Sequence, residues 1–353
     1  MNSIKISENR CIGENFTPYV IAEAGINHNG DFEIAKQLVY HAARSGADAI
    51  KFQKRTIDDM YTKEFLNREY LKDYSFGKTY GEHKKFLELS DEQFFELQAM
   101  AKSFNIDFLV SGFEFASFEF IEKQLHVPMH KIPSPFINHF PLLKQVAQYG
   151  KPIVLSTGMH SLDEIKPAVD FIRQYNDKIV VMQTTTLYPC QNEDANLKVL
   201  LTLKKELNTL VGYSSHDKGV VLPAAAVAYG ACIIEKHFTL DRTMIGPDHI
   251  ASVEPRGLEL ICKYAKTVFQ GLGSPDKTIL EAEKPQKLKY GVSIVSKNKI
   301  VKGQVLQRED ITVKCPGGGI SPRYFDSIIG KVAQKDIPED SIIYEEDINL
   351  TYS

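Results

Sequence analysis

His216 and His237 each stand at the end of a short apolar segment, in GYSSH and in CIIEKH. If these segments are neighbouring strands of a parallel sheet, the two imidazoles lie side by side at one edge of that sheet. Neutral imidazole is the commonest side-chain ligand of metals, and two histidines without a cysteine thiolate suit an exchangeable catalytic ion. The pair could equally act as ordinary hydrogen-bonding groups. Asp217 and Glu235 adjoin the histidines and could orient their rings.

Other apolar segments also end in polar or charged side chains. In chain order these are Glu23, Lys51, Gln53, Ser111, Lys131, Ser134, Ser156, Thr157, Thr184, Thr185, Thr186, Ser214 and Ser215. A single hydroxyl of this kind is usually a helix cap or a solvated strand end. Two lysines from different segments, with several hydroxyls between them, instead match the oxygens of a phosphorylated carboxylate. The pattern indicates a small anionic phosphate ester as substrate.

These side chains need a scaffold that brings many strand ends together. A glycine followed by an apolar run recurs in SGADAIKFQ (45–53), YGKPIVLSTG (149–158) and YGACIIEKHF (229–238), as is typical of βα repeats with buried parallel strands. Further strands are expected at 19–24, 107–111, 130–132, 179–183 and 210–213. Asp31, and Ser90 with Gln93, predict the starts of two intervening helices. Eight alternating strands and helices favour a closed (β/α)8 TIM barrel, with an open doubly wound sheet as the alternative.

Changes in the pattern of apolar and polar residues along the chain predict its domains. Residues 1–272 are expected to form the barrel, 273–288 a polar linker and 289–353 a small β-rich domain, because apolar and polar residues alternate after the linker. The stretch 54–89 is too long for an ordinary βα loop and carries seven aromatic residues among charges. We expect it to be a lid or an oligomer contact.

Composition narrows the class of protein. The chain has 42 basic and 45 acidic side chains, a net charge of −3 and no basic stripe, so nucleic acid is not an expected partner. No apolar run approaches the ~20 residues that cross a bilayer, and the N-terminus lacks the apolar core of a signal peptide. We expect a cytoplasmic protein with no membrane partner and five reduced cysteines. A P-loop and a dinucleotide fingerprint are both missing from the sequence.

Several ordered motifs carry a family resemblance. They are IAEAGINHNG (21–30), KFQ (51–53), LSTGM (155–159), GYSSH (212–216), EKHFTLD (235–241), GPDH (246–249) and VKCPGGGISPRYFDSIIGK (313–331). Together they resemble the sialic acid synthases and their relatives that make legionaminic acid, pseudaminic acid or spore-coat polysaccharide. The resemblance covers nearly the whole chain. It implies that the C-terminal region is an antifreeze-like (SAF) domain of the β-clip type.

The resemblance also implies a reaction, that of a transferase. C3 of phosphoenolpyruvate would attack the aldehyde of an open-chain N-acylated sugar, water would add at C2, and phosphate would leave. The acceptor would be N-acetylmannosamine or a diacetamido-trideoxyhexose. A divalent metal, Mn2+ or Mg2+, would be held by His216 and His237 and would polarise the aldehyde oxygen. The family exchanges its terminal domain between protomers, so a domain-swapped homodimer is implied as well.

The same resemblance assigns a role to each strand-end residue. The catalytic residues would be Glu23, which acts on the water at C2, Lys51, and Glu235, which handles the proton at the aldehyde oxygen. Phosphoenolpyruvate would be bound by Lys51, Ser111, Lys131, Ser134, Thr186 and Ser214. The sugar would contact Gln53, Tyr188 and Asp248.

Departures from the family pattern fall on the sugar side. Relatives often carry an arginine where this chain has Cys315, a glutamate where it has Phe136, and two arginines where it has Gly291-Val292. The acceptor is therefore the open part of the prediction. One alternative is a phosphoenolpyruvate aldol synthase for a different, phosphorylated aldose, although the terminal domain weighs against it. The other is a non-catalytic sugar-binding protein of polysaccharide assembly, which would leave the retained glutamates, lysine and histidine pair unexplained.

Overall fold

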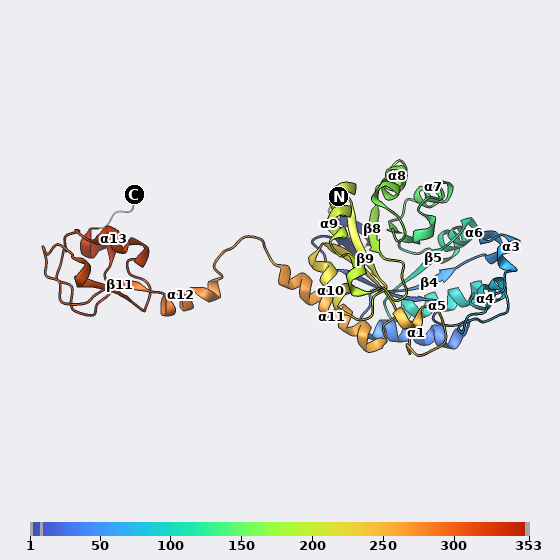
Figure 1. Ribbon diagram of the computed structural model, residues 1–353, viewed down its shortest axis with the longest axis horizontal. Coiled ribbons are helices and arrows are strands. Elements are labelled where there is room, and N and C mark those ends of the chain that lie inside the picture. The colour runs from blue at the N-terminus through green and yellow to red at the C-terminus, as the bar shows by residue number, and fades with distance from the viewer. Residues whose placement is uncertain (1–2, 8–9, 350–353) are drawn as a thin grey trace. The chain divides into compact units, whose positions relative to one another are not determined.

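The predicted strands form a closed parallel barrel in the computed structural model, which describes residues 3–7 and 10–349 (Figure 1). Its strands are β3 (Tyr19–Gly25), β4 (Ala49–Lys54), β5 (Asp107–Gly112), β6 (His130–Ile132), β7 (Ile153–Ser156), β8 (Ile179–Thr184), β9 (Leu210–Ser215) and β10 (Ala231–His237). The sheet closes because β10 pairs with β3, with Ile233 opposite Tyr19 and His237 opposite Glu23. The (β/α)8 barrel is confirmed, and the open-sheet alternative is wrong.

Helices surround the barrel and alternate with its strands. They are α1 (Phe32–Arg44), α5 (Asp91–Ser103), α6 (Phe115–Phe120), α7 (Phe140–Gln148), α8 (Leu162–Arg173), α9 (Val199–Leu207), α10 (Val221–Ala228) and α11 (Pro255–Leu272). The predicted caps are present: the Asp31 carboxylate accepts from the backbone of Glu33 at 2.8 Å, and Ser90 and Gln93 form a capping box. Among residues 3–7 and 10–349, no helix is long and apolar enough to span a bilayer.

Short helical turns complete the connections of this unit. They are the π-helical turn η1 (Ile121–Leu125) and the 3-10 turns η2 (Ser134–Phe136), η3 (Asn192–Ala195) and η4 (His249–Ala251). η2 follows β6 directly and begins at Ser134, so the residue predicted to bind phosphate lies at the start of a tight turn.

An N-terminal hairpin that the sequence analysis did not anticipate packs against the barrel. Its strands are β1 (Ser3–Ser7) and β2 (Arg10–Gly13), which pair antiparallel. Ile4, Ile6 and Ile12 join the hydrophobic core of the barrel. Arg10 forms an ion pair with Asp48 at 2.6 Å, just before β4 begins. The hairpin therefore lies at the end of the barrel where the strands start.

The stretch 54–89 folds into three short helices, α2 (Ile57–Met60), α3 (Lys63–Leu66) and α4 (Tyr80–Phe86). Its two ends are joined by Arg55, whose Nη1 donates to Glu88 Oε1 at 2.6 Å and whose backbone N–H donates to Glu88 Oε2 at 3.0 Å. Aromatic rings fill its interior, among them Tyr61 and Tyr80 with centroids 5.3 Å apart. The insertion is thus a packed structure whose two ends are held together by the ion pair of Arg55 and Glu88.

Residues 274–353 form a second compact unit, separate from residues 1–273. Its elements are η5 (Glu281–Glu283), α12 (Lys284–Tyr290), β11 (Ser293–Ser296), η6 (Arg308–Asp310), β12 (Ile311–Lys314), η7 (Pro322–Tyr324), α13 (Phe325–Ile328) and α14 (Glu345–Ile348). β11 and β12 form an antiparallel pair, and Ile294, Ile300 and Leu306 belong to its core. The unit also contains isolated antiparallel bridges, which join Val295 to Ile342, Ile300 to Ile337 and Val305 to Val332.

Gly212 on β9 is tightly packed between the neighbouring strands β8 and β10. A Cβ at this position would lie 2.3 Å from Met182 Sδ and 2.8 Å from the carbonyl oxygen of Ile233. Gly212→Ala should lower the free energy of unfolding by about 1–3 kcal/mol, because a backbone carbonyl cannot move aside without widening the barrel. Urea unfolding with linear extrapolation measures the change.

Gly271→Ala is the matched control, because nothing lies within 4 Å of its added Cβ. Gly271 belongs to α11, so alanine should leave stability unchanged or raise it by up to about 1 kcal/mol. If Gly212→Ala is as stable as Gly271→Ala, the barrel interior tolerates the methyl group at residue 212.

Candidate active site

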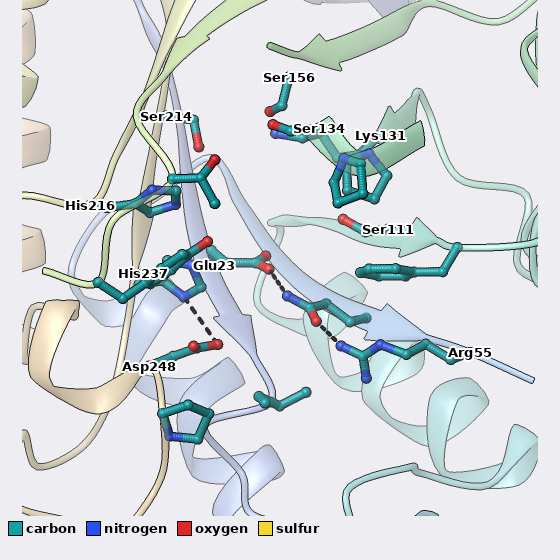
Figure 2. A pocket seen from close by; sticks show the side chains of 18 of the residues that line it. Glu23, Arg55, Ser111, Lys131, Ser134, Ser156, Ser214, His216, His237 and Asp248 are labelled. Atoms are coloured by element: carbon teal, nitrogen blue, oxygen red, sulfur yellow. Dashed lines mark hydrogen bonds and ion pairs between the residues drawn. The ribbon is translucent and has the colours of Figure 1, made fainter. Parts of the chain in front are cut away.

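A pocket opens where the carboxyl ends of the barrel strands converge. It has a volume of about 320 Å³, near the lower limit for small-molecule sites. All the predicted site residues line it: Glu23, Lys51, Gln53, Ser111, Lys131, Ser134, Thr186, Tyr188, Ser214, His216, Glu235, His237 and Asp248. Figure 2 shows His216, His237 and Asp248 on one side, facing Lys131, Ser134 and Ser156 on the other. The structure brings these residues together, while their individual roles remain predictions.

Two lysines and two glutamates form the floor of the pocket. Lys51 Nζ lies 2.6 Å from Glu23 Oε2 and 3.5 Å from Glu235 Oε1, and it donates to Ser111 Oγ at 2.9 Å. Lys131 Nζ donates to both oxygens of Glu235 at 2.9 Å. All four charged side chains are buried. A buried charge is stable only when an opposite charge compensates it, so this arrangement is a balanced set of two cations and two anions.

The balance sets the protonation states. Burial opposes the charge on Lys51, but the carboxylates of Glu23 and Glu235 outweigh burial and raise the pKa of Lys51. Burial lowers the pKa of Lys131, and Glu235 only partly offsets that effect. For Glu235, burial alone would raise the pKa, yet Lys131 and Lys51 hold it below its usual range. Glu235 is therefore a carboxylate at neutral pH in the free protein.

Hydroxyl and amide groups form a cradle beside the lysines. Ser134 Oγ accepts from the Gly158 backbone N–H at 2.9 Å. A Cβ on Gly158 would lie 2.0 Å from Thr186 Oγ1 and 3.1 Å from Ser134 Oγ, so only glycine leaves this space open. Thr186 Oγ1 is buried and has no hydrogen-bond partner among the described residues. This hydroxyl therefore has a hydrogen-bond donor that the described residues leave unused.

The two histidines approach each other from β9 and β10. Their ring centroids are 5.4 Å apart, and the ring of Tyr188 lies 4.2 Å from that of His216. The Thr185 carbonyl accepts from His216 Nδ1 at 2.6 Å, which leaves Nε2 of that ring with a lone pair. Burial, reinforced by the charge of His237, lowers the pKa of His216 to about 3. His216 is therefore a neutral imidazole, the form that binds metals.

The residues that orient these rings differ from those expected. Asp217 accepts from the Tyr213 hydroxyl at 3.1 Å and from Ser215, in a buried cluster that also holds Lys236. Glu235 is engaged by the lysines. The expectation that Asp217 and Glu235 orient the histidines was wrong, because both carboxylates already have closer donors. Asp248 Oδ2 lies 3.9 Å from His237 Nδ1 instead.

The histidine pair fits a divalent ion. The Nδ1 of His237 is buried and has no hydrogen-bond partner among the residues described, as expected of a nitrogen that binds an ion or water. Within residues 3–7 and 10–349, no cluster of three or more histidine, cysteine or carboxylate side chains is arranged to hold a metal. The protein would thus supply two nitrogen ligands and leave the other positions to substrate or water.

The opposite wall comes from the 54–89 insertion, none of whose residues was predicted to belong to the site. Arg55, Tyr61, Tyr70, Tyr80, His83 and Lys84 all line the pocket. Gln53 links this wall to the floor, because its Nε2 donates to Glu23 Oε1 at 2.8 Å and its Oε1 accepts from Arg55 (Figure 2). The density of tyrosines among charges in an unusually long βα loop was the signal available in the sequence.

The positions that depart from the family pattern lie in different parts of the chain. Phe136 packs edge-to-face against Phe113, with ring centroids 5.7 Å apart, and Phe113 itself lines the pocket. Cys315, Gly291 and Val292 belong to the second compact unit, where Cys315 is exposed. The apolar substitution at residue 136 therefore lies behind the pocket wall.

Comparison with known proteins identifies the family of this site. Residues 38–277 match the NeuB family, and residues 291–349 match the SAF domain. The first match spans more than half of the chain. The chain belongs to the NeuB family. The expected SAF domain is confirmed as well.

Individual relatives agree with this NeuB-family assignment. Human N-acetylneuraminate-9-phosphate synthase is 38% identical over 345 residues, which cover 97% of this chain and 96% of the human protein. The N,N'-diacetyllegionaminic acid synthase of Legionella pneumophila is 39% identical over 324 residues, 90% of this chain and 91% of that protein. The crystal structure of an N-acetylneuraminic acid synthetase from Leptospira borgpetersenii matches with a TM-score of 0.72 at 31% identity, covering 81% of this chain and 95% of that one. This NeuB-family chain is thus an enzyme of the expected class, a phosphoenolpyruvate-dependent synthase that forms a carbon–carbon bond.

The floor of the pocket makes a prediction about stability. Lys131→Met leaves the buried Glu235 carboxylate with only the more distant Lys51, so the free energy of unfolding should fall by about 3 kcal/mol. Adding Glu235→Gln removes the uncompensated charge and should restore at least half of that loss. Urea unfolding of the two single variants and the double variant measures the coupling. Additive effects would mean that the two side chains do not stabilise each other.

Proposed function

We propose that this enzyme condenses phosphoenolpyruvate with the aldehyde of an open-chain, N-acylated amino sugar to make a nonulosonic acid. The observation that carries the proposal is the buried set of two lysines and two glutamates beside an open hydroxyl cradle and a histidine pair. Relatives named for N-acetylneuraminate 9-phosphate and for diacetyllegionaminic acid support this product class. The acceptor would be N-acetylmannosamine, a derivative of it, or a diacetamido-trideoxyhexose.

Phosphoenolpyruvate brings a phosphate and a carboxylate to the floor of the pocket. Lys51 and Lys131 would bind these groups through charge-assisted hydrogen bonds, with donors from Ser111, Ser134, Thr186 and Ser214. The open space over Gly158 and the unpartnered Thr186 hydroxyl support a phosphate at the cradle. Binding would thus hold C3 of the enol in a fixed position, facing the histidine side of the pocket.

Ligand binding would change the charge balance around Glu235 and so allow this side chain to transfer a proton. The lysines lower the pKa of Glu235 in the free protein, so this side chain cannot donate a proton until they are engaged elsewhere. When the ligand's anions attract Lys51 and Lys131, the pKa of Glu235 rises, so that Glu235 can take up a proton from solvent and pass it to the oxygen of the attacked aldehyde. Glu23, held by Lys51 and Gln53, would accept a proton from the water that adds at C2. The tetrahedral C2 centre then releases phosphate.

The histidine pair is the proposed site of Mn2+ or Mg2+. When bound, such an ion supplies Lewis-acid polarisation of the aldehyde oxygen. His216 and His237 would hold it, and the Thr185 carbonyl fixes the tautomer of His216. Tyr188 and Asp248 lie on the same side and, with Gln53, would contact the sugar.

A turnover assay tests the proposal. The enzyme, incubated with phosphoenolpyruvate, Mn2+ and a panel of amino sugars, should release phosphate and form a product whose mass is that of the acceptor plus pyruvate. A chelator should abolish this activity, and adding metal back should restore it in the unaltered enzyme. In the His216→Ala and His237→Ala variants, low concentrations of metal should fail to restore it. Glu23→Gln should lower kcat by at least about 100-fold, in line with loss of general base catalysis.

Two outcomes would contradict the proposal. Absence of product with every acceptor in the panel would refute the reaction for amino sugars. Full activity in a metal-free preparation would refute the metal site while leaving the condensation itself intact.

We further propose that the working unit is a homodimer in which the SAF domain of one chain covers the pocket of the other. The pocket is lined by charges and open to water, and controlled access of a single water to C2 requires a cover. The segment 273–283 between α11 and α12 is polar and carries a proline, which suits a spacer between two compact units. Exchange of the domain between two chains gives a closed two-fold assembly.

Complementation between two inactive variants tests this arrangement. Full-length Glu235→Ala lacks a working pocket, and a chain ending at Gly273 lacks the SAF domain, so each should be inactive alone. A mixed dimer joins an intact pocket to an intact SAF domain, and part of the activity should return. Native mass spectrometry establishes whether mixed dimers form. If they form and remain inactive, each SAF domain must act on its own barrel.

A further inference from the structure

Lys84 differs from the other two lysines of the pocket. Lys51 and Lys131 each lie within ion-pair distance of a glutamate, whereas no carboxylate of the described residues lies within that distance of Lys84. Its Nζ lies over the face of the Tyr80 ring, 5.3 Å from the centroid. The adjacent Lys85 is exposed and paired with Asp58 at 2.8 Å. Lys84 thus has no ion-pair partner among the described residues, and the charges of Asp248 and Glu88 act on it only from farther away.

The surroundings of Lys84 are rich in hydrogen-bond donors. Arg55 is close enough for its charge to act on Lys84, and it is itself buried and lines the pocket. The hydroxyls of Tyr61 and Tyr80 lie 3.3 Å apart in the same wall. Burial, followed by the charge of Arg55, lowers the pKa of Lys84 to about 8, so the amine is still protonated at neutral pH. Two cations and several hydroxyls therefore face one end of the pocket.

The carboxylates near this end are already engaged. Glu88 forms two hydrogen bonds with Arg55, and Asp248 lies 3.9 Å from His237. Lys84 is half-buried, and a partly desolvated lysine without an ion-pair partner is stabilised when an anion binds beside it. The ligand rather than the protein is therefore the natural source of the missing negative charge.

This end is distinct from the place proposed for phosphoenolpyruvate. Lys51 and Lys131 stand on barrel strands β4 and β6, whereas Arg55 and Lys84 belong to the 54–89 insertion. Gln53 separates Arg55 from the floor of the pocket, because its amide is hydrogen-bonded to Arg55 on one side and to Glu23 on the other. An anion bound here would belong to the other substrate, the sugar.

We infer that the acceptor sugar carries a phosphate monoester on its terminal carbon, away from the aldehyde, and that Lys84 and Arg55 bind it. The inference rests on the proposed function and deepens it. A phosphate offers three acceptor oxygens and close to two negative charges, which match two cations and neighbouring tyrosine hydroxyls better than a carboxylate does. A 6-deoxy sugar has no oxygen at that carbon to carry the phosphate. The inference thus favours a phosphorylated N-acyl hexosamine over a diacetamido-trideoxyhexose.

A comparison of two acceptors tests the inference. With phosphoenolpyruvate and Mn2+ present, kcat/KM should be higher for N-acetylmannosamine 6-phosphate than for N-acetylmannosamine. Lys84→Met should lower kcat/KM for the phosphorylated sugar by about 10- to 100-fold, the value of one charge-assisted hydrogen bond, chiefly through KM. The same change should leave kcat/KM for the unphosphorylated sugar nearly unaltered. Lys84→Arg should retain the preference, because it keeps the charge.

Lys85→Met is the matched control, since it removes a neighbouring lysine that lies outside this pocket. Thermal unfolding of each variant shows whether the fold survives the change. Preference for the unphosphorylated sugar, or equal losses with both sugars in folded Lys84→Met, would overturn the inference and leave the proposed condensation standing. The inference would also be overturned if the enzyme accepted only a diacetamido-trideoxyhexose. It would likewise be overturned if the enzyme accepted no acceptor at all. In the last of these cases the proposed function fails too.

Discussion

Charge compensation at the floor of the pocket is the constraint on which the rest of the site depends. Lys51 and Lys131 are almost completely removed from water, and only Glu23 and Glu235 make their burial tolerable. These four residues come from four different strands, β3, β4, β6 and β10. A one-residue slip in any of those strands would turn its charge out of the barrel and leave an opposite charge unpaired. The charges of the pocket are therefore compensated only when the strands of the closed sheet are in the correct register.

The scaffold could be read from the sequence to the extent that its signals are local. Short apolar runs, three of them after a glycine, predicted all eight barrel strands, because a strand buried on both faces needs an unbroken apolar segment. Pairing between β10 and β3 depends on residues far apart in the chain, so closure was a hypothesis until the structure supplied the register. The N-terminal hairpin was missed, although Ile4 and Ile6 alternate with polar residues, because so short an alternating segment becomes stable only when it packs on the barrel.

The same distinction applies to the pocket. Residues at strand ends were predictable, since all carboxyl ends of a parallel barrel lie on one face. The partners of those residues were not, because hydrogen bonding depends on distances that no motif contains. Asp217 follows His216 directly, yet its carboxylate turns toward Tyr213 and Ser215. Lys84 lies 33 residues beyond Lys51 in a connecting segment, and only the folding of that segment brings it to the pocket.

The pairing of β3 with β10 also has a consequence for how the chain reaches its native state. These partners are separated by roughly 200 residues, so β3 leaves the ribosome long before the strand that covers its second edge exists. Until then the growing sheet has an unpaired apolar edge, which is the feature that makes folding intermediates aggregate. Contacts of such long sequence separation also slow folding. Glu235 stands on β10, so it can join the two lysines of the pocket floor only when β10 is in place.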